Sequence, residues 1–133
     1  MANARWNTRR LYKFESEFFR GNFLNRPRSI VVLRLLAAKI WRAHSIRGQV
    51  MPRIVCGRGV LYNGSLYSYY QEDDGIVLAR NQRTIPILLH ELVHALGYDD
   101  HDRMFVDAYF RLLREYASLN WWELMQARIK YKI

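Results

Sequence analysis

The sequence predicts an α+β fold in a single domain, residues 1–133, with N-terminal helices, a small antiparallel sheet of about three strands, and two further helices. Apolar residues recur at helical spacing before residue 45 and again after residue 84. Between these regions the chain consists of short β-like runs separated by turn residues. Hydrophobic residues make up 50% of the chain, which excludes a disordered protein.

The first helix is expected from Trp6 to Phe19, ending near Gly21. Its start is basic and aromatic, a combination that contacts nucleic-acid backbones and stacks on bases, although such aromatic residues more often pack on their own domain. The residues concerned are Arg5, Trp6, Arg9, Arg10, Tyr12 and Lys13. A second helix is expected from its cap Ser29 to about Ser45, as a core helix with an apolar circumference.

The middle of the chain is predicted to be an antiparallel meander that leads directly into the next helix. Its turns are marked by Asn-Gly and Asp-Gly pairs, and Asn-Gly is a strong hairpin signal. The expected strands and turns are, in order, Arg53–Cys56 with Val60–Tyr62 as one interrupted strand, Asn63-Gly64, Leu66–Gln71, Asp73-Asp74-Gly75 and Ile76–Ala79.

The helix after the sheet contains the pattern H-E-x-x-H, formed by His90, Glu91 and His94. Thr84 is its expected N-cap, and Gly97 is its expected end because glycine accepts the left-handed conformation. At about 100° per residue, His90 and His94 lie about 40° apart on one side of the helix. Glu91 lies beside them, and the opposite face is apolar.

This pattern has the chemistry of a zinc site. Two imidazoles from one rigid helix supply two ligands, and catalytic zinc sites use three protein ligands and a water. A neighbouring glutamate can stay off the metal and accept a proton from that water. His101 is the favoured third ligand, because Asp102 caps the next helix and would hold the preceding histidine; Asp100 or Asp102 are the alternatives.

The run H-E-L-V-H-A-L-G followed by H-D-R-M-F resembles the small zincin-type metallopeptidases, especially SprT-like and related minimal domains, over about residues 76 to 116. The resemblance implies that His90, His94 and His101 bind zinc and that Glu91 is the general base. In those peptidases a strand at the sheet edge pairs with the substrate backbone, and Ile76–Arg80 is the expected edge. Metzincins place a histidine where this chain has Asp100.

Two other functions compete with peptide hydrolysis. The run His94-Ala95-Leu96-Gly97-Tyr98-Asp99-Asp100-His101 is similar to the H-L-x-G-Y-D-H of bacterial rRNA-maturation endoribonucleases, with one extra residue before the last histidine. That family needs no acid at the position of Glu91. A non-catalytic assembly protein with a structural zinc is the third possibility, and it would use four protein ligands. An oxyanion in the peptidase would need a further donor, for which Tyr98, Tyr109 and Arg103 are candidates.

Charge and cysteine content indicate partners and compartment. The formal net charge of +9 favours nucleic acid as a possible partner beside a protein or peptide substrate, although dispersed basic residues also suit a solvated surface. The single Cys56, expected to be buried, indicates a reducing, cytoplasmic compartment. No signal peptide or bilayer-spanning run is visible, so no membrane partner is expected. The Trp-rich tail from Asn120 to Ile133 is expected to form a further helix or a docking surface.

Overall fold

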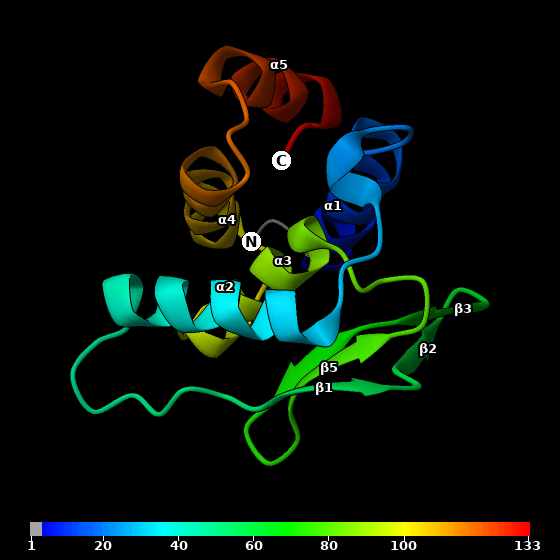
Figure 1. The fold of residues 1–133 in the computed structure, drawn as a ribbon. Coiled ribbons are helices and arrows are strands. Elements are labelled where there is room, and N and C mark those ends of the chain that lie inside the picture. The colour runs from blue at the N-terminus through cyan, green and yellow to red at the C-terminus, as the bar shows by residue number, and fades with distance from the viewer. Residues whose placement is uncertain (1–3) are drawn as a thin grey trace.

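A computed structural model describes the backbone of residues 4–133 and the side chains from residue 7 onward. The fold is α+β, as predicted (Figure 1). The helical elements are α1 Ala4–Phe18, the 3-10 turn η1 Phe23–Asn25, α2 Ile30–His44, α3 Ile85–Ala95, α4 Arg103–Tyr116 and α5 Trp121–Tyr131. The strands are β1 Ile54–Gly57, β2 Val60–Tyr62, β3 Ser65–Tyr67, β4 Tyr69–Gln71 and β5 Gly75–Ala79.

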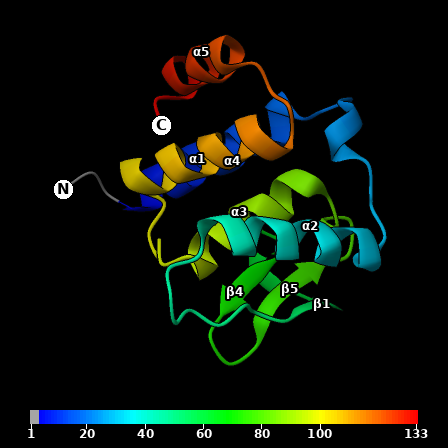
Figure 2. The ribbon, with the colours of Figure 1, turned by 60° about the vertical axis from the view of Figure 1, so that its left-hand side comes forward.

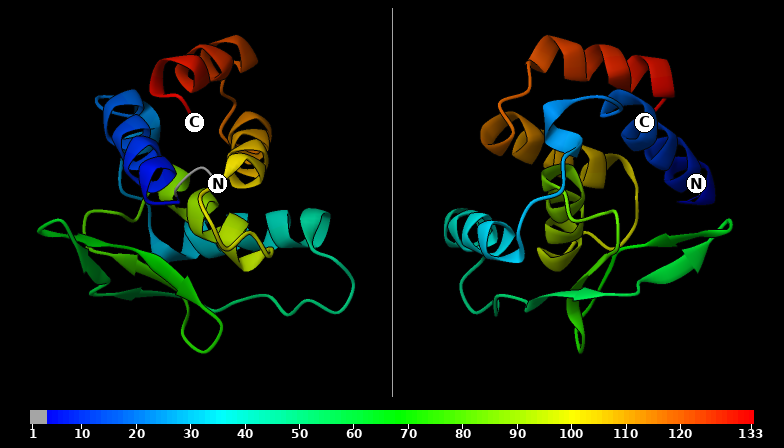
Figure 3. Two further views of the ribbon diagram at one scale, coloured as in Figure 1. Left: turned by 180° about the vertical axis from the view of Figure 1, so that it is seen from behind. Right: turned by 45° about the vertical axis from the view of Figure 1, so that its right-hand side comes forward.

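Helices and strands occupy separate layers. The sheet lies beneath α2 and α3, and α1 and α4 lie on the opposite side of α3 (Figures 1 and 2). Helix α5 crosses above α1 and α4 and covers them, while the β2–β3 hairpin extends from the end of the sheet on the side of α1 (Figure 3). Helix α3 is therefore central. Among the described helices, none is long and apolar enough to cross a membrane.

The sheet differs from the predicted meander in its strand order, β1-β5-β4. Strand β5 pairs with β4 in antiparallel orientation but with β1 in parallel orientation, so the expected wholly antiparallel sheet is wrong. Strand β5 is also not an edge strand, and the expected substrate-binding edge at Ile76–Arg80 is wrong for that reason. All five residues of β5 are buried, as expected for an apolar strand with a partner on each side.

The expected interrupted strand is divided between two sheets. Strand β1 belongs to the three-stranded sheet, whereas β2 forms a separate hairpin with β3. Gly59 lies between them at φ +84°, and a Cβ there would lie 2.4 Å from the carbonyl oxygen of Tyr67. The hairpin itself confirms the sequence prediction, because Asn63 and Gly64 at its turn both have the positive φ of a type I′ turn (47° and 80°).

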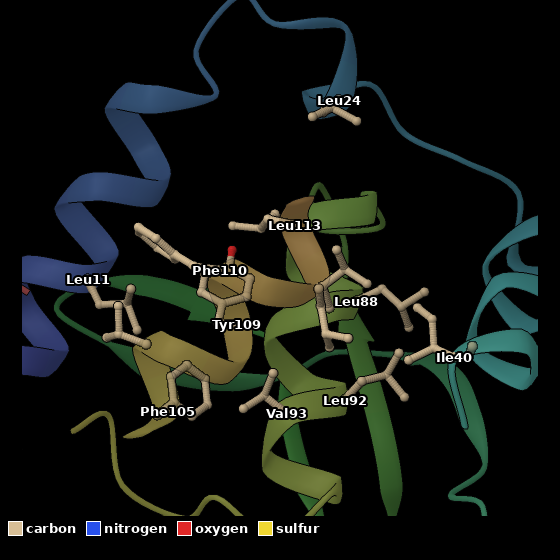
Figure 4. Packing of buried hydrophobic residues seen from close by; sticks show 14 of the residues in the cluster. Leu11, Leu24, Ile40, Leu88, Leu92, Val93, Phe105, Tyr109, Phe110 and Leu113 are labelled. Atoms are coloured by element: carbon tan, nitrogen blue, oxygen red, sulfur yellow. The ribbon is translucent and has the colours of Figure 1, made fainter. Parts of the chain in front are cut away.

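The core surrounds α3. Leu88, Leu92 and Val93 of α3 pack with Ile40 of α2 and with α4 residues such as Phe110 (Figure 4). The predicted caps of α2 and α4 are confirmed, since Ser29 Oγ accepts from the Val32 amide and Asp102 Oδ1 from the Phe105 amide.

Three surface features complete the comparison with the sequence. Helix α2 buries only one face and leaves Val31 and Leu35 exposed, so it is not the core helix expected. Cys56 is exposed rather than buried. The tail forms α5, which buries Leu124 and leaves Trp122 70% exposed.

Candidate metal centre

Helix α3 positions the three residues of the H-E-x-x-H pattern on its buried side. Thr84 occupies the N-cap position, as predicted, but its hydroxyl makes no capping hydrogen bond. The helix ends before Gly97, whose φ of +118° turns the chain back. His90 is 2% exposed and Glu91 5% exposed, so both side chains are held inside the protein rather than on its surface.

The turn after α3 returns His101 to the histidine pair. His101 Nε2 lies 2.9 Å from His90 Nε2 and 3.0 Å from His94 Nε2. In the described part of the chain, these three residues form a group that could hold a metal ion, with their candidate ligand atoms within 4.8 Å of one another. The three imidazoles therefore lie close enough to hold a metal ion, as the sequence predicted.

Each of the three rings is fixed by a second contact at its other nitrogen. His90 Nδ1 lies 2.9 Å from Glu15 Oε2, and His94 Nδ1 lies 2.7 Å from the carbonyl oxygen of Tyr98. His101 Nδ1 lies 2.8 Å from the hydroxyl of Thr8. A carboxylate and a carbonyl only accept hydrogen bonds, so Nδ1 of His90 and His94 must donate.

These contacts select the tautomer that a metal needs. A neutral imidazole that donates at Nδ1 has its lone pair at Nε2, and the Nε2 atoms are the ones that converge. The Thr8 hydroxyl can accept from His101 in the same way. Such outer partners orient metal-bound histidines and raise their affinity for the ion. The site is thus arranged for a ligand at the common point of the three Nε2 atoms.

The electrostatic environment favours neutral imidazoles at two of the three positions. Burial lowers the pKa of His94 to about 4, with the charge of His90 acting in the same direction and the Tyr98 carbonyl opposing. Burial lowers the pKa of His101 to about 2, reinforced by the charges of His90 and His94. Burial also lowers the pKa of His90, but the carboxylates of Glu15 and Glu91 outweigh it, and the net direction is upward.

Glu91 stands beside the cluster in a pocket of about 210 Å³. The pocket is lined by Tyr12, Val60, Ser68, Tyr69, Tyr70, His90, Glu91, His94 and Asp99. Burial raises the pKa of Glu91 to about 8; the charge of His90 opposes this effect and that of Glu15 adds to it. The arrangement therefore places an ion site, a carboxyl that can exchange a proton near neutral pH, and space for a small group next to one another.

The alternative third ligands do not join the cluster. Asp102 accepts the Phe105 amide as the cap of α4, and Asp100 is exposed. His44 lies elsewhere, near the end of α2, 3.0 Å from Glu115 Oε2.

None of the three expected oxyanion donors lines the pocket. The Tyr109 hydroxyl lies 2.8 Å from Glu15 Oε2 and 3.2 Å from the Pro86 carbonyl oxygen. Tyr98 lines a different pocket, beside His44, and Arg103 is exposed.

The sequence did not identify the part of α1 that completes the site. Thr8, Tyr12 and Glu15 come from α1, whose aromatic residues were expected to pack on the domain more often than to contact nucleic acid, and they lie against histidines more than 70 positions away. The one sequence feature that groups these three residues is their spacing, since positions i, i+4 and i+7 lie on one face of a helix. Tyr12 packs on the domain; the side chains of Arg5 and Trp6 lie outside the described residues.

Comparison with known proteins does not assign the chain to a family. No protein-family model matches it, and neither a curated protein nor a solved structure does.

Proposed function

We propose that this protein is a zinc-dependent metallopeptidase of the small zincin type. The observation that supports this most strongly is the convergence of three Nε2 atoms, each ring held by a second hydrogen bond, beside the buried carboxyl of Glu91.

The donor set fits zinc. Zinc binds neutral imidazole nitrogens, and its catalytic sites combine three protein ligands with an open position, whereas structural sites are closed by a fourth protein ligand. In the described chain the cluster consists of His90, His94 and His101, without a carboxylate or thiol as a fourth member. The adjoining pocket leaves room for water and substrate. This favours a catalytic ion over a structural one.

The lining of the pocket favours a peptide over RNA. Among the described residues, its charged side chains besides histidine are the two acids Glu91 and Asp99, and the rest of the described lining is tyrosines, Val60 and Ser68. Among the described side chains, residues 7–133, no Lys or Arg, the usual partners of phosphate groups, lines it. The described basic side chains therefore lie outside the pocket, and a neutral peptide backbone suits this lining better than a phosphodiester.

Strand β4 offers a place for the substrate backbone. It is an edge strand, paired on one side with β5, and Tyr69 and Tyr70 of β4 line the pocket. An extended peptide can add to such an edge through main-chain hydrogen bonds. This role belongs to β4 in our proposal, because β5 has a partner on both sides.

Each group of the site then has its own role in the proposed reaction. Zinc, when bound, polarises a carbonyl and lowers the pKa of water to about 7. Glu91 takes a proton from the attacking water and returns it to the leaving amine when the C–N bond breaks. Its burial is consistent with this role, because a carboxyl with a pKa raised to about 8 both accepts and releases protons near neutral pH. Hydrogen bonds with Glu15, Thr8 and the Tyr98 carbonyl hold the three imidazole rings in fixed orientations.

The test is a Glu91→Gln variant, which keeps the side-chain shape and removes the base. Zinc content measured by elemental analysis should remain at one ion per chain, while hydrolysis of an unfolded protein should fall by about 10²–10⁴-fold. Glu115→Gln on α4 is the matched control, since its carboxylate contacts His44 and Arg111 outside the pocket. It should retain wild-type hydrolysis.

Three results would contradict the proposal. One is full hydrolysis by the Glu91→Gln variant, and another is metal-dependent cutting of structured RNA with no cutting of unfolded protein. The third is wild-type protein that binds zinc, unfolds when the zinc is removed and cleaves no peptide, which would indicate a structural ion.

A further inference from the structure

Peptide hydrolysis in this pocket requires a group that stabilises negative charge on the substrate. When water adds to the carbonyl carbon, the carbonyl oxygen becomes an oxyanion, and donors aimed at that position contribute a large part of catalysis. The donors suggested by the sequence, Tyr98, Tyr109 and Arg103, do not line the pocket. Another residue must be sought among those that do.

Tyr12 is placed where such a donor is needed. It comes from α1, lines the same pocket as Glu91, and its ring centroid lies 6.0 Å from that of His90 and 5.6 Å from that of His101. It therefore reaches the metal cluster from a different element than the three histidines. A substrate carbonyl entering the pocket would lie between α3 and this ring.

The hydroxyl of Tyr12 is free to donate. Within the described side chains, residues 7–133, the hydroxyls of Tyr12 and Tyr70 have no hydrogen-bond partner, and Tyr12 is the one of the two whose ring packs against histidines of the cluster. The hydroxyls of Tyr69 and Ser68 are engaged. Tyr69 donates to Asp74 Oδ2 at 3.1 Å, and Ser68 Oγ accepts the Ala79 amide at 2.8 Å. A phenol without a partner beside a buried carboxyl is a donor that a ligand can satisfy.

The β2–β3 hairpin holds this ring in place. Tyr67 stacks on Tyr12 with centroids 4.6 Å apart and an interplanar angle of 12°, and Tyr62 meets its edge at 5.3 Å and 86°. Aromatic pairs of this geometry add stabilisation beyond the area they bury. The hairpin therefore has a function in the site, because a donor fixed before the substrate arrives needs no reorganisation during the reaction.

From this geometry we infer that Tyr12 is a catalytic residue whose hydroxyl donates a hydrogen bond to the scissile carbonyl oxygen, and that Tyr62 and Tyr67 position it. The inference rests on the proposed peptidase function. As water adds to the carbonyl carbon, Glu91 accepts one proton and the carbonyl oxygen gains the negative charge that Tyr12 stabilises. The carbonyl then re-forms, the C–N bond breaks, and the amine takes the proton from Glu91. Tyr12 keeps its own proton throughout.

The first test is Tyr12→Phe, which keeps the stacked ring and removes only the donor. We expect kcat to fall by about 10²–10³-fold with little change in KM, because the lost interaction forms mainly in the transition state. Zinc content should not change. Tyr116→Phe is the matched control, since its hydroxyl contacts His44 away from the pocket, and it should leave kcat unchanged.

The second test measures binding instead of turnover. A peptide phosphonamidate presents a tetrahedral anion in place of the carbonyl, whereas a peptide thiol presents no such oxygen. Calorimetry on the zinc-loaded protein should show phosphonamidate affinity reduced by at least about tenfold in Tyr12→Phe, with thiol affinity unchanged.

The outcomes separate the two proposals. If Glu91→Gln is inactive but Tyr12→Phe keeps wild-type kcat and phosphonamidate affinity, the role of Tyr12 is overturned and the peptidase function stands. If the wild-type protein binds zinc but hydrolyses no peptide, the peptidase function fails and the role of Tyr12 fails with it.

Discussion

The pocket has two walls of different construction. The helical wall, formed by α1, α3 and the turn before α4, contains His90, His94 and Glu91, of which Glu91 is 5% exposed. The strand wall, formed by the β2–β3 hairpin and β4, contains tyrosines and Val60, which is 46% exposed. The proposed metal ligands and base lie on the buried wall, and the proposed surface for a substrate lies on the more exposed wall.

The attachments of the two walls explain this difference. Phe105 of α4 is fully buried. The centroid of its ring lies 4.9, 4.6 and 4.9 Å from the ring centroids of His90, His94 and His101. The hairpin instead packs its tyrosines on Tyr12 and exposes Leu61 on its other face. Metal chemistry requires geometry within fractions of an ångström, and packed elements provide it better than a two-stranded ribbon does.

The largest contrast between the walls should come from apolar truncation. Phe105→Ala removes the ring under the histidines and should lower the free energy of unfolding by about 3–5 kcal/mol, the usual cost of deleting a buried Phe. Leu61→Ala on the hairpin, 73% exposed, should change it by less than about 0.5 kcal/mol. Denaturant titration of both variants in chelator measures the difference. Equal effects would show that the hairpin is as integral to the core as α4.

The next expected effect is a pH dependence of the free energy of unfolding, which arises from histidines of the helical wall. The pKa values of His94 and His101 are lowered by burial to about 4 and about 2, so in acid the unfolded chain binds protons that the folded chain does not. The contribution of these two imidazoles to the free energy of unfolding should therefore fall as pH decreases from about 6.5, by up to about 1.4 kcal/mol per pH unit for each imidazole. The raised pKa values of His90 and Glu91 act with the opposite sign.

A variant with both His94→Gln and His101→Gln isolates this contribution, because His90 and Glu91 remain in both proteins. The metal-free wild type should lose stability relative to the variant as pH falls from about 6.5 toward 4. Chemical denaturation at a series of pH values gives the comparison. Parallel stability curves would mean that the two histidines are solvated in the folded protein, and that the helical wall is more open than the structure shows.

A smaller effect should come from the outer partners of the ligands. Glu15→Gln keeps an acceptor for His90 Nδ1 but removes the charge, and loss of such partners typically lowers metal affinity by about 10–100-fold. Glu17→Gln is the matched control on the same helix, since Glu17 is exposed and accepts the Tyr131 hydroxyl instead. Competition with a chromogenic chelator measures both affinities. If Glu17→Gln weakened zinc binding as strongly, the effect would come from net charge and not from contact with His90.

The helical wall was also the easier wall to predict from sequence. His90, Glu91 and His94 lie within one helix, so their arrangement follows from helical geometry, and the cap formed by Asp102 fixes His101. Those relationships are local. The contribution of α1 is not, because nothing in the sequence near Thr8 or Glu15 specifies which distant residue each will meet.

In the strand wall, too, local features could be predicted from the sequence and distant pairings could not. Its hairpin was predictable because Asn63-Gly64 determines the turn, but the parallel pairing of β1 with β5 joins segments separated by the whole hairpin. The short runs around β1 suit either pairing equally well by composition. Strand β5 is buried along its whole length, which suits a strand with a partner on each side, and this burial is a property of the assembled sheet.

The smallest predicted effect tests whether the strand wall acts on catalysis through the position of Tyr12. Gly64 has φ +80°, and a Cβ added there would meet no atom within 4 Å, so Gly64→Ala adds backbone strain of about 1 kcal/mol and no steric clash. Amide exchange in β2 and β3 should quicken by about fivefold, and kcat should fall by no more than that factor, while zinc affinity stays unchanged. Gly48→Ala is the matched control. Gly48 lies between α2 and β1, away from the hairpin, at φ +95° and with equally open surroundings, so the substitution adds a similar backbone strain. It should alter neither amide exchange in β2 and β3 nor kcat. A hairpin that loosens without any change in kcat would show that Tyr12 keeps its position without Tyr62 and Tyr67, and that α1 alone sets the geometry of the donor.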